Sequence, residues 1–451
     1  MSLHFCAKPL YSETCSVPSS ESYSPSCSYF VAMNKIQKIW STLGPGFLYA
    51  GAAIGVSHLV QSTKAGAQYG FTLLGIVILS NVLKFPFFEA GPRYAAATGE
   101  NLIQGYRRIG KWAVWMFTIL TASTAFIIQA AVTIVTAALF SNLIGIDFTG
   151  LEASAILLAI CGTILFVGQY NWLDSIIKWV VILLTIASII AFFRAQSVDT
   201  EVTLWPEWVT NGTSFVFLFA LMGWMPAPID IAAWHSIWTV EKKQGQGGKL
   251  SLKEALRDFH IGYWGTAVLA MVFLSLGALV LFANGVALNT PSGAEFSQGF
   301  IKIYTETLGA WTYPIIAFAA FATMFSTTIT VLDGAPRVAD QLVPALQGKE
   351  NSNQKRIYRI TIIIVALGAL FLIWQYAGKS AFGTLIKIAT ITSFITAPLL
   401  GFLNFKLAFS KHMPVDARPG MLNKIVGIVG LVFLGSFALV YLLFLMGVIT
   451  F

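Results

Sequence analysis

Two apolar stretches of this chain are interrupted in their middle, and these interruptions decide the expected fold. Residues 44–58 read GPGFLYAGAAIGVSH, and the apolar stretch continues to Gly70. Residues 218–230 read LFALMGWMPAPID, and this second stretch continues to Trp238. Unwound backbone at membrane depth needs protein or water to satisfy its amides and carbonyls. In secondary transporters such breaks mark the substrate site, so the pattern predicts a carrier for a small polar or ionic solute.

The composition indicates an integral membrane protein. Of the 451 residues, 56% are hydrophobic and 11% are charged, whereas a soluble domain has about 25% charged residues. The mean hydropathy is +0.74. Eleven apolar stretches are each long enough, at about 20 residues, to cross the hydrocarbon core. They lie near 43–69, 71–97, 113–141, 151–168, 172–193, 213–238, 259–283, 311–332, 358–378, 381–409 and 424–449.

The net charge of +8 is a topology signal rather than a sign of nucleic-acid binding. Most of the 28 Lys and Arg residues precede the first span or lie in every second connection after it. Because cytoplasmic loops carry the excess of Lys and Arg, this pattern predicts a cytoplasmic N-terminus and an outside C-terminus. We expect a cell (inner) membrane location, with the lipid bilayer and a small ion or small molecule as partners. Homo-oligomerisation stays open.

The chain is expected to form one polytopic membrane domain at 33–451. Residues 1–32 are rich in Ser, Tyr and Pro and predict a disordered tail, with Met33 as an alternative natural start. The four cysteines lack the spacing of a metal site or a disulfide framework. Neither Gly-x-Ser-x-Gly nor His-Glu-x-x-His occurs, so the sequence indicates neither an enzyme nor a cofactor.

Polar residues at the two breaks are functional candidates, because such groups are costly within a membrane. His58 could ligate a metal, accept a proton, bind substrate, or bond a neighbouring carbonyl as packing. Met225 is a soft ligand that favours transition metals, with core filling as the alternative. Asp230, the only acid in its span, could bind a cation, pair with His58 or His235, or cap the second half-helix.

A second set of polar residues could serve a coupling ion. Lys84 and Glu89 lie deep in the second span, where they could form a proton route or replace an ion's charge. Glu89 and Arg93 could instead form a structural ion pair, and Lys387 lies in the tenth span. Hydroxyls of the eighth span could face the first break as a sodium cage or bond neighbouring helices. These hydroxyls belong to Thr323, Ser326, Thr327, Thr328 and Thr330.

Four motifs occur in the same order in one family of transporters. The first span carries AGAQYGF at 65–71, and the second carries LSN at 79–81. Met-Pro at 225–226 and STTIT at 326–330 follow in the sixth and eighth spans. In these motifs, and in the order of spans from about 43 to 449, the chain resembles the NRAMP family of divalent-metal transporters.

The resemblance implies a leucine-transporter-like fold. This is an all-α integral membrane fold of eleven transmembrane helices, with two inverted five-helix repeats and one extra C-terminal helix. Helices 1 and 6, the first of each repeat, are broken. An odd number of spans per repeat agrees with such an inversion. The resemblance also implies alternating access and metal uptake driven by protons.

The chain departs from the family at the breaks. The family's Asp-Pro-Gly-Asn is replaced by GVSH at 55–58, so the metal-binding carboxylate is missing. Met225 is kept, Met222 replaces a small residue, Ala227 replaces a histidine, and a third-span acid of the family's proton route falls on Gln129. By the resemblance, the substrate lies beside Gly55, Ser57, His58, Met222, Met225, Ala227 and Asp230, with His58 and Met225 as metal ligands. The expected coupling route comprises Lys84, Glu89, Gln129, Ser326, Thr327 and Thr330.

Two functions stay open at this point. The first is a secondary active transporter, ion-coupled, that moves a divalent metal cation such as Mn²⁺ or Fe²⁺ by alternating access. The second is a carrier on the same fold for an amino acid, an organic ion or a small anion, since the metal-binding motif is replaced. Half-helix N-termini and the Lys84 ammonium would attract an anionic group.

Overall fold

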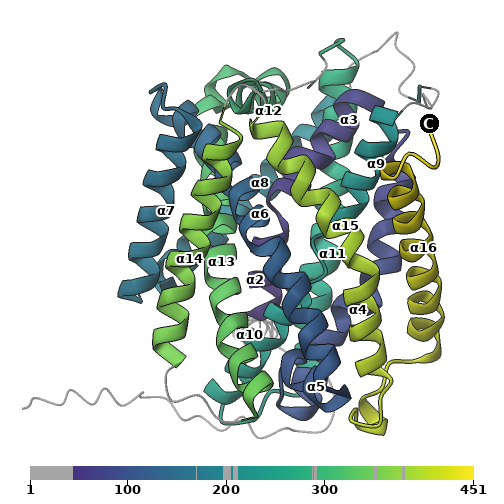
Figure 1. Ribbon diagram of the computed structural model, residues 1–451. Helices are drawn as coiled ribbons and strands as arrows, with labels where there is room; N and C mark the ends of the chain where they lie inside the picture. Colours follow the sequence, from purple (N-terminus) through teal and green to yellow (C-terminus); the bar gives the residue numbers. More distant parts are fainter. Residues whose placement is uncertain are drawn as a thin grey trace, which may run out of the picture. The chain divides into compact units, whose positions relative to one another are not determined.

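All regular elements in the described part of the chain are helices (Figure 1). The computed structural model describes residues 44–168, 170–196, 205–206, 212–286, 288, 292–348, 354–377 and 381–450. Within helix α8, the side chains of 170–178 and 180 are not described, nor is that of 354. The predicted tail 1–32 and the alternative start lie outside these ranges.

Eight of the described helices are long and apolar enough to cross a membrane. These are α4 (Leu74–Thr98), α6 (Lys111–Ile144), α7 (Gly150–Val167), α11 (Leu252–Leu276) continued by the π-helix η2 (Gly277–Phe282), α13 (Tyr313–Gln347), α14 (Gln354–Gln375), α15 (Ala381–Ala408) and α16 (Met421–Leu445). The other three predicted spans are α8 (Tyr170–Ala195), the first broken span and the second broken span. The predicted all-α membrane fold is therefore confirmed.

Short helices connect the spans. Helix α5 (Leu102–Ile109) follows α4, and α12 (Gly293–Leu308) lies at the opposite end of the bundle (Figure 1). Two 3₁₀ turns, η3 (Ala310–Thr312) and η4 (Val415–Ala417), precede α13 and α16. Below, these two ends of the bundle are called the α5 end and the α12 end.

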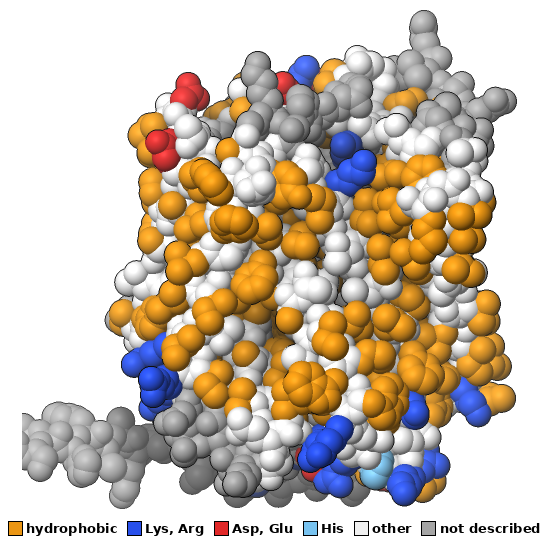
Figure 2. Space-filling model, in the orientation of Figure 1, with side chains coloured by type: hydrophobic (Ala, Val, Ile, Leu, Met, Phe, Trp, Pro, Cys, Tyr) orange, Lys and Arg blue, Asp and Glu red, His pale blue; other side chains and the backbone are white. Residues whose placement is uncertain are grey.

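The outside of the bundle suits a lipid environment. Large apolar side chains are exposed along its length, among them Phe193, Leu367 and Val432. Figure 2 shows them as a hydrophobic band, with most visible Lys and Arg at the α5 end and Asp and Glu at the α12 end. Lipid removes the cost that water would impose on such a surface, so this arrangement agrees with a bilayer-spanning bundle.

The first predicted break is confirmed and is short. Helix α2 (Pro45–Ala53) ends before Ile54, and Gly55 takes an irregular conformation with φ −122° and ψ −129°. The chain resumes as the π-helix η1 (Val56–Ser62) and the α-helix α3 (Thr63–Tyr69). A Cβ at Gly55 would lie 2.7 Å from Thr327 Cγ2, so glycine permits the close approach of α13.

The second break is longer because prolines enforce it. Helix α9 (Gly212–Trp224) stops before Met225, and α10 begins at Ile231 (Ile231–Gly245). Pro226 and Pro228 lack backbone N–H donors and cannot continue the helix. Helix α4 packs on α10, and α11 with η2 packs on α3, which is the relation expected of two inverted repeats.

Helix α2 is held at its N-terminus by a distant carboxylate. Asp258 of α11 accepts hydrogen bonds from Gly44 N at 3.2 Å and Gly46 N at 3.0 Å. Pro45 at the first helical position has no N–H to satisfy. Lys242 of α10 places its Nζ 3.7 Å from Asp258 Oδ2, so three helices meet at this carboxylate.

Helix α3 and η2 touch through their backbones. A Cβ at Gly66 would lie 1.9 Å from Leu274 O, and one at Gly277 would lie 2.2 Å from Thr63 O. Small residues allow this approach between membrane helices, where side chains would otherwise separate the backbones. The half of the first span that lies toward the α12 end is thus fixed to the seventh span.

Candidate functional site

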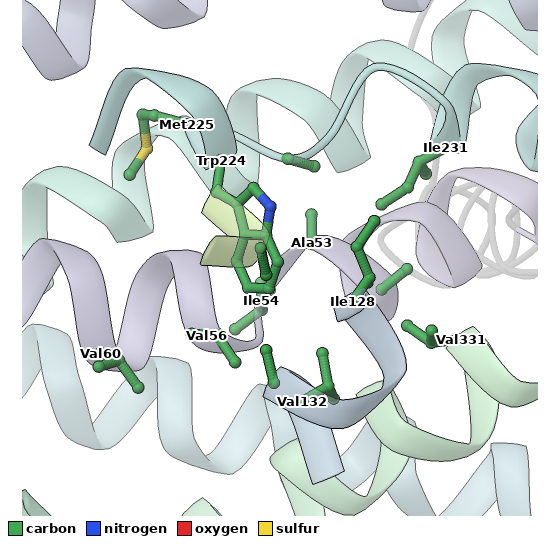
Figure 3. Close-up of a cluster of buried hydrophobic side chains, with 14 of the residues drawn as sticks. Ala53, Ile54, Val56, Val60, Ile128, Val132, Trp224, Met225, Ile231 and Val331 are labelled. Atoms are coloured by element: carbon green, nitrogen blue, oxygen red, sulfur yellow. The ribbon is translucent and has the colours of Figure 1, made fainter. Parts of the chain in front are cut away.

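The two breaks meet at a small cavity of about 20 Å³, which is room for one water molecule or a small ion. Its lining is mostly apolar. Figure 3 shows the apolar side chains that gather here from the broken spans, α6 and α13, including Val56, Ile128, Ile231 and Val331. The carboxylate of Asp230 is the one charged group in this lining.

Two polar atoms in the cavity wall have no hydrogen-bond partner within the described ranges. They are Asp230 Oδ1 and Trp234 Nε1, and Asp230 is 5% exposed. Although Asp230 occupies the N-cap position of α10, its side chain makes no capping hydrogen bond. A buried carboxylate oxygen without a partner is costly, so this atom is suited to receive a cation or a proton.

His58 is fully buried and joins three segments by its ring. Its Nε2 lies 2.9 Å from Thr266 O, and its Nδ1 lies 2.8 Å from both Ala53 O and Ser57 Oγ. A ring that donates to both carbonyls carries a positive charge, whereas a neutral ring has one N–H and donates to only one of them. The Ser57 hydroxyl itself donates to Ala53 O. A metal ligand needs a free nitrogen lone pair, which this conformation does not offer to the cavity.

The two candidate metal ligands do not share the cavity. Met225 and Met222 are fully buried, and neither of them nor His58 lines it, whereas Ser57 and Ala227 do. Across the described ranges, no group of three or more His, Cys, Asp and Glu could hold a metal ion. Asp230 also does not pair with His58 or His235, since both His235 nitrogens lack a partner there.

Lys84 of α4 donates hydrogen bonds to backbone carbonyls at the end of α9, where the second break begins. Its fully buried Nζ donates to Met222 O at 2.5 Å and to Gly223 O at 2.9 Å. The break leaves the last carbonyls of α9 without helical donors, and a cation at a helix C-terminus is favourable. Lys84 therefore satisfies the end of α9 with its own charge.

Glu89 belongs to a polar network away from the breaks. Its carboxylate lies 3.0 Å from Arg93 Nη2 and accepts from His260 Nε2 at 2.8 Å and Asn423 Nδ2 at 2.7 Å. These contacts tie α4 to α11 and to α16. This is the structural ion pair that the sequence offered as an alternative to a proton route.

The eighth-span hydroxyls face different neighbours. Thr327 Oγ1 donates to Gly51 O at 2.9 Å, which joins α13 to α2. Thr328 instead bonds Thr136 of α6 at 2.6 Å, and Thr323 bonds its own helix. Ser326 and Thr330 line a larger, mainly apolar cavity of about 250 Å³ between α2, α8, α11 and α13.

Gln129 lies on α6 beside the same helix α13. Its Nε2 is 3.1 Å from Thr133 Oγ1 and 3.4 Å from Thr328 O, while its Oε1 has no partner among the residues described. The structure therefore brings Asp230, Ser57, Ala227 and Thr327 together at one cavity. His58, Met225, Lys84, Glu89 and Gln129 do not line that cavity.

Sequence reasoning missed three contributors to the site. Trp234 adds a free indole N–H, Thr266 fixes the His58 ring, and Asp258 holds the start of α2. The Gly-Pro-Gly start of α2 signals a helix N-terminus in need of a cap. Its partner lies 212 residues away, and no local pattern could identify it.

Two spans broken at matching places of inverted repeats, with a small cavity between them that contains one carboxylate, define a secondary transporter. The family model described as natural resistance-associated macrophage protein-like (Nramp) matches residues 46–444. The chain belongs to this family.

Curated relatives extend over most of the chain. An uncharacterized protein of Pasteurella multocida is 36% identical over 408 residues, covering 89% of this chain and 92% of its own length. The divalent metal cation transporter MntH of Mesorhizobium japonicum is 22% identical, covering 83% and 89%. The Eremococcus coleocola manganese transporter has the same fold, with a TM-score of 0.69, 15% identity and coverage of 90% and 86%.

Proposed function

We propose that this chain is a secondary active transporter that moves a divalent metal cation, Mn²⁺- or Fe²⁺-like, by alternating access. Family membership and the names of the Mesorhizobium and Eremococcus transporters support the substrate class. The observation that carries the proposal is the buried carboxylate of Asp230 in the cavity between the two breaks, whose Oδ1 has no hydrogen-bond partner among the described residues. It supplies the negative charge that the first break lacks.

The cation would be held mainly by oxygen atoms. Asp230 provides the charge, the hydroxyls of Ser57 and Thr327 line the same cavity, and unwound backbone adds carbonyl oxygens. Met225 directly follows Trp224, which lines the cavity. A local rotation of the unwound backbone would therefore bring the Met225 thioether to the ion. A dehydrated dication gains little from an apolar wall, so the carboxylate must offset most of the desolvation cost.

The distribution of charged residues supports one orientation of the chain in the membrane. The Lys- and Arg-rich α5 end would be cytoplasmic in an inner membrane, with the C-terminus outside (Figure 2). The Asp258 contacts at the start of α2 would close the inner side, and their release would let α2 move. His58 is suited to carry the coupling proton, because its ring sits between carbonyl acceptors and the Ser57 hydroxyl.

The second candidate function is transport of a non-metal solute on the same fold. The observations that favour it are the mostly apolar lining of the cavity and the engagement of both His58 nitrogens. Such a solute would approach the half-helix ends through an anionic or polar group.

Calorimetry on the purified chain tests the metal proposal. Mn²⁺, Cd²⁺ and Mg²⁺ are titrated into the parent, Asp230→Asn and Asp147→Asn, where Asp147 is an acid remote from the breaks. We expect micromolar Mn²⁺ or Cd²⁺ binding that Asp230→Asn abolishes and Asp147→Asn preserves. Absence of binding by every dication would reject the metal and leave the second candidate.

A further inference from the structure

A second cavity, of about 350 Å³, opens between α3, α9 and α15. Its size is at the lower end of the range of about 300–1,000 Å³ found for small-molecule pockets. Val60 and Gln61 of η1 line it, about one turn beyond Ser57 and the first break. Ala220 of α9, one turn before Trp224, also lines it, so the cavity adjoins both broken spans on the α12 side.

Two lysines from different repeats line this cavity, and no acidic residue does. Lys64 belongs to α3 and Lys387 to α15, so two helices each bring an ammonium group to the lining of one cavity. Lys64 Nζ lies 5.8 Å from the centre of the Phe217 ring, which keeps the charge at the cavity wall. Neither ammonium pairs with a carboxylate in the described part of the chain.

Gln61 provides an independent sign of a ligand. Its side chain is 4% exposed, lines the cavity, and has no hydrogen-bond partner in the ranges described. The hydrogen-bonding capacity of this amide is therefore available to a ligand in the cavity. The amide N–H₂ and the two ammonium groups together present hydrogen-bond donors to the same space.

We propose that this cavity is a binding site for a small carboxylate-type oxyanion. Two ammonium groups in one cavity repel each other, and an anion between them removes that repulsion while forming charge-assisted hydrogen bonds. A dication without bound anions would be repelled by the same two ammonium groups. The inference rests on the proposed transport route, because the site lies on the outward side of the breaks.

The anion could arrive in two forms with the same chemistry. It could be free in solution, or it could be a polycarboxylate that carries the metal cation as a complex of net negative charge. In the second form the site selects a chelated metal before the cation reaches Asp230. Citrate serves as the probe, because it exists in both forms.

The test measures citrate binding to the full-length purified chain by calorimetry, with and without equimolar Mn²⁺. The variants are Lys64→Gln, Lys387→Gln and their double variant, each checked for an unchanged elution profile and thermal midpoint. Lys302→Gln is the matched control, since that exposed lysine of α12 pairs with Glu306 at 3.4 Å outside the cavity. Loss of each lysine should weaken binding by about tenfold or more, and Lys302→Gln should not change it.

Arginine variants separate charge from folding. Lys64→Arg and Lys387→Arg keep the charge and should keep binding, and higher salt should weaken it in parallel. Binding of citrate alone supports a free anion, and binding only with Mn²⁺ supports the chelate. Absent citrate binding, or equal binding by the parent and the double variant, overturns the inference. Asp230→Asn is titrated with Mn²⁺ separately, so a failed metal proposal would not be confused with a failed anion site.

Discussion

Replacing Asp258 by Ala should release helix α2, the half of the first span that lies toward the α5 end. In the structure this carboxylate accepts two backbone hydrogen bonds from the start of α2, at 3.2 and 3.0 Å, and it is buried beside Lys242. A hydrogen bond to a charged group contributes about 1.5–3 kcal/mol. When α2 moves out, water replaces part of these hydrogen bonds. We therefore expect Asp258→Ala to destabilise the state with α2 docked, relative to the state with α2 released, by about 2–3 kcal/mol, or roughly 30- to 150-fold in the conformational equilibrium.

Cysteine labelling measures this shift. Ala53→Cys, at a position that is 1% exposed in this conformation, is introduced after removal of the native cysteines. Asp258→Ala should raise its rate of reaction with a membrane-impermeant maleimide by roughly 30- to 150-fold, because the reactive state becomes more populated. The reagent is applied from the side of the α5 end, which is the cytoplasmic side in the proposed orientation.

Glu254→Gln is the matched control on the same helix, because the Glu254 carboxylate accepts from Ser251 N and Ser251 Oγ at the start of α11, and a Gln side chain can keep these bonds. Its labelling rate should equal that of the parent. If Asp258→Ala also labels at the parent rate while its thermal midpoint is unchanged, the carboxylate does not hold α2 and the reasoning is refuted.

Three further predictions concern the packing of the broken spans. Lys84→Met should lower the thermal midpoint, because two buried carbonyls of α9 lose their donor at about 1–3 kcal/mol each; an unchanged midpoint would contradict this. The double variant Gly55→Asp with His58→Asn restores the family carboxylate, but it should fail to fold, since the new Cβ lies 2.7 Å from Thr327 Cγ2. A triple variant that adds Thr327→Ala should fold and bind Mn²⁺ in calorimetry. Gly277→Ala should reduce the yield of folded protein in size-exclusion chromatography, because its Cβ meets a backbone oxygen at 2.2 Å; a normal yield would rule out the rigid contact.

The breaks could be predicted because their cause is local. Two prolines within three residues prevent a helix at 226–228, and length and hydropathy set the spans around them. The predicted eighth span ends near 332, where hydropathy falls, and this gives no sign of how far the helix extends beyond the span. The helix continues to Gln347, with Asp333 and Arg337 paired at 2.6 Å.

The candidate site could be predicted in its residues but not in its contacts. The sequence singled out His58, yet the oxygen that binds its Nε2 belongs to a residue 208 positions away. Asp230 was singled out as the one acid of its span, but only the structure shows that its Oδ1 has no partner in the described ranges. Such facts depend on how distant helices meet, which no local pattern encodes.

The backbone contact between α3 and η2 also provides a distance reference for measurements of conformational change. Because Gly66 and Gly277 leave no side chain to slide or rotate between the two segments, the distance across this contact should stay constant through the transport cycle. If spectroscopic probes on these two segments show a change in distance, that change would come from the labels or the measurement and not from the protein. Any change measured from α3 to α9 or α15 could be assigned to those helices, which makes this contact the natural reference frame for following the cycle in time.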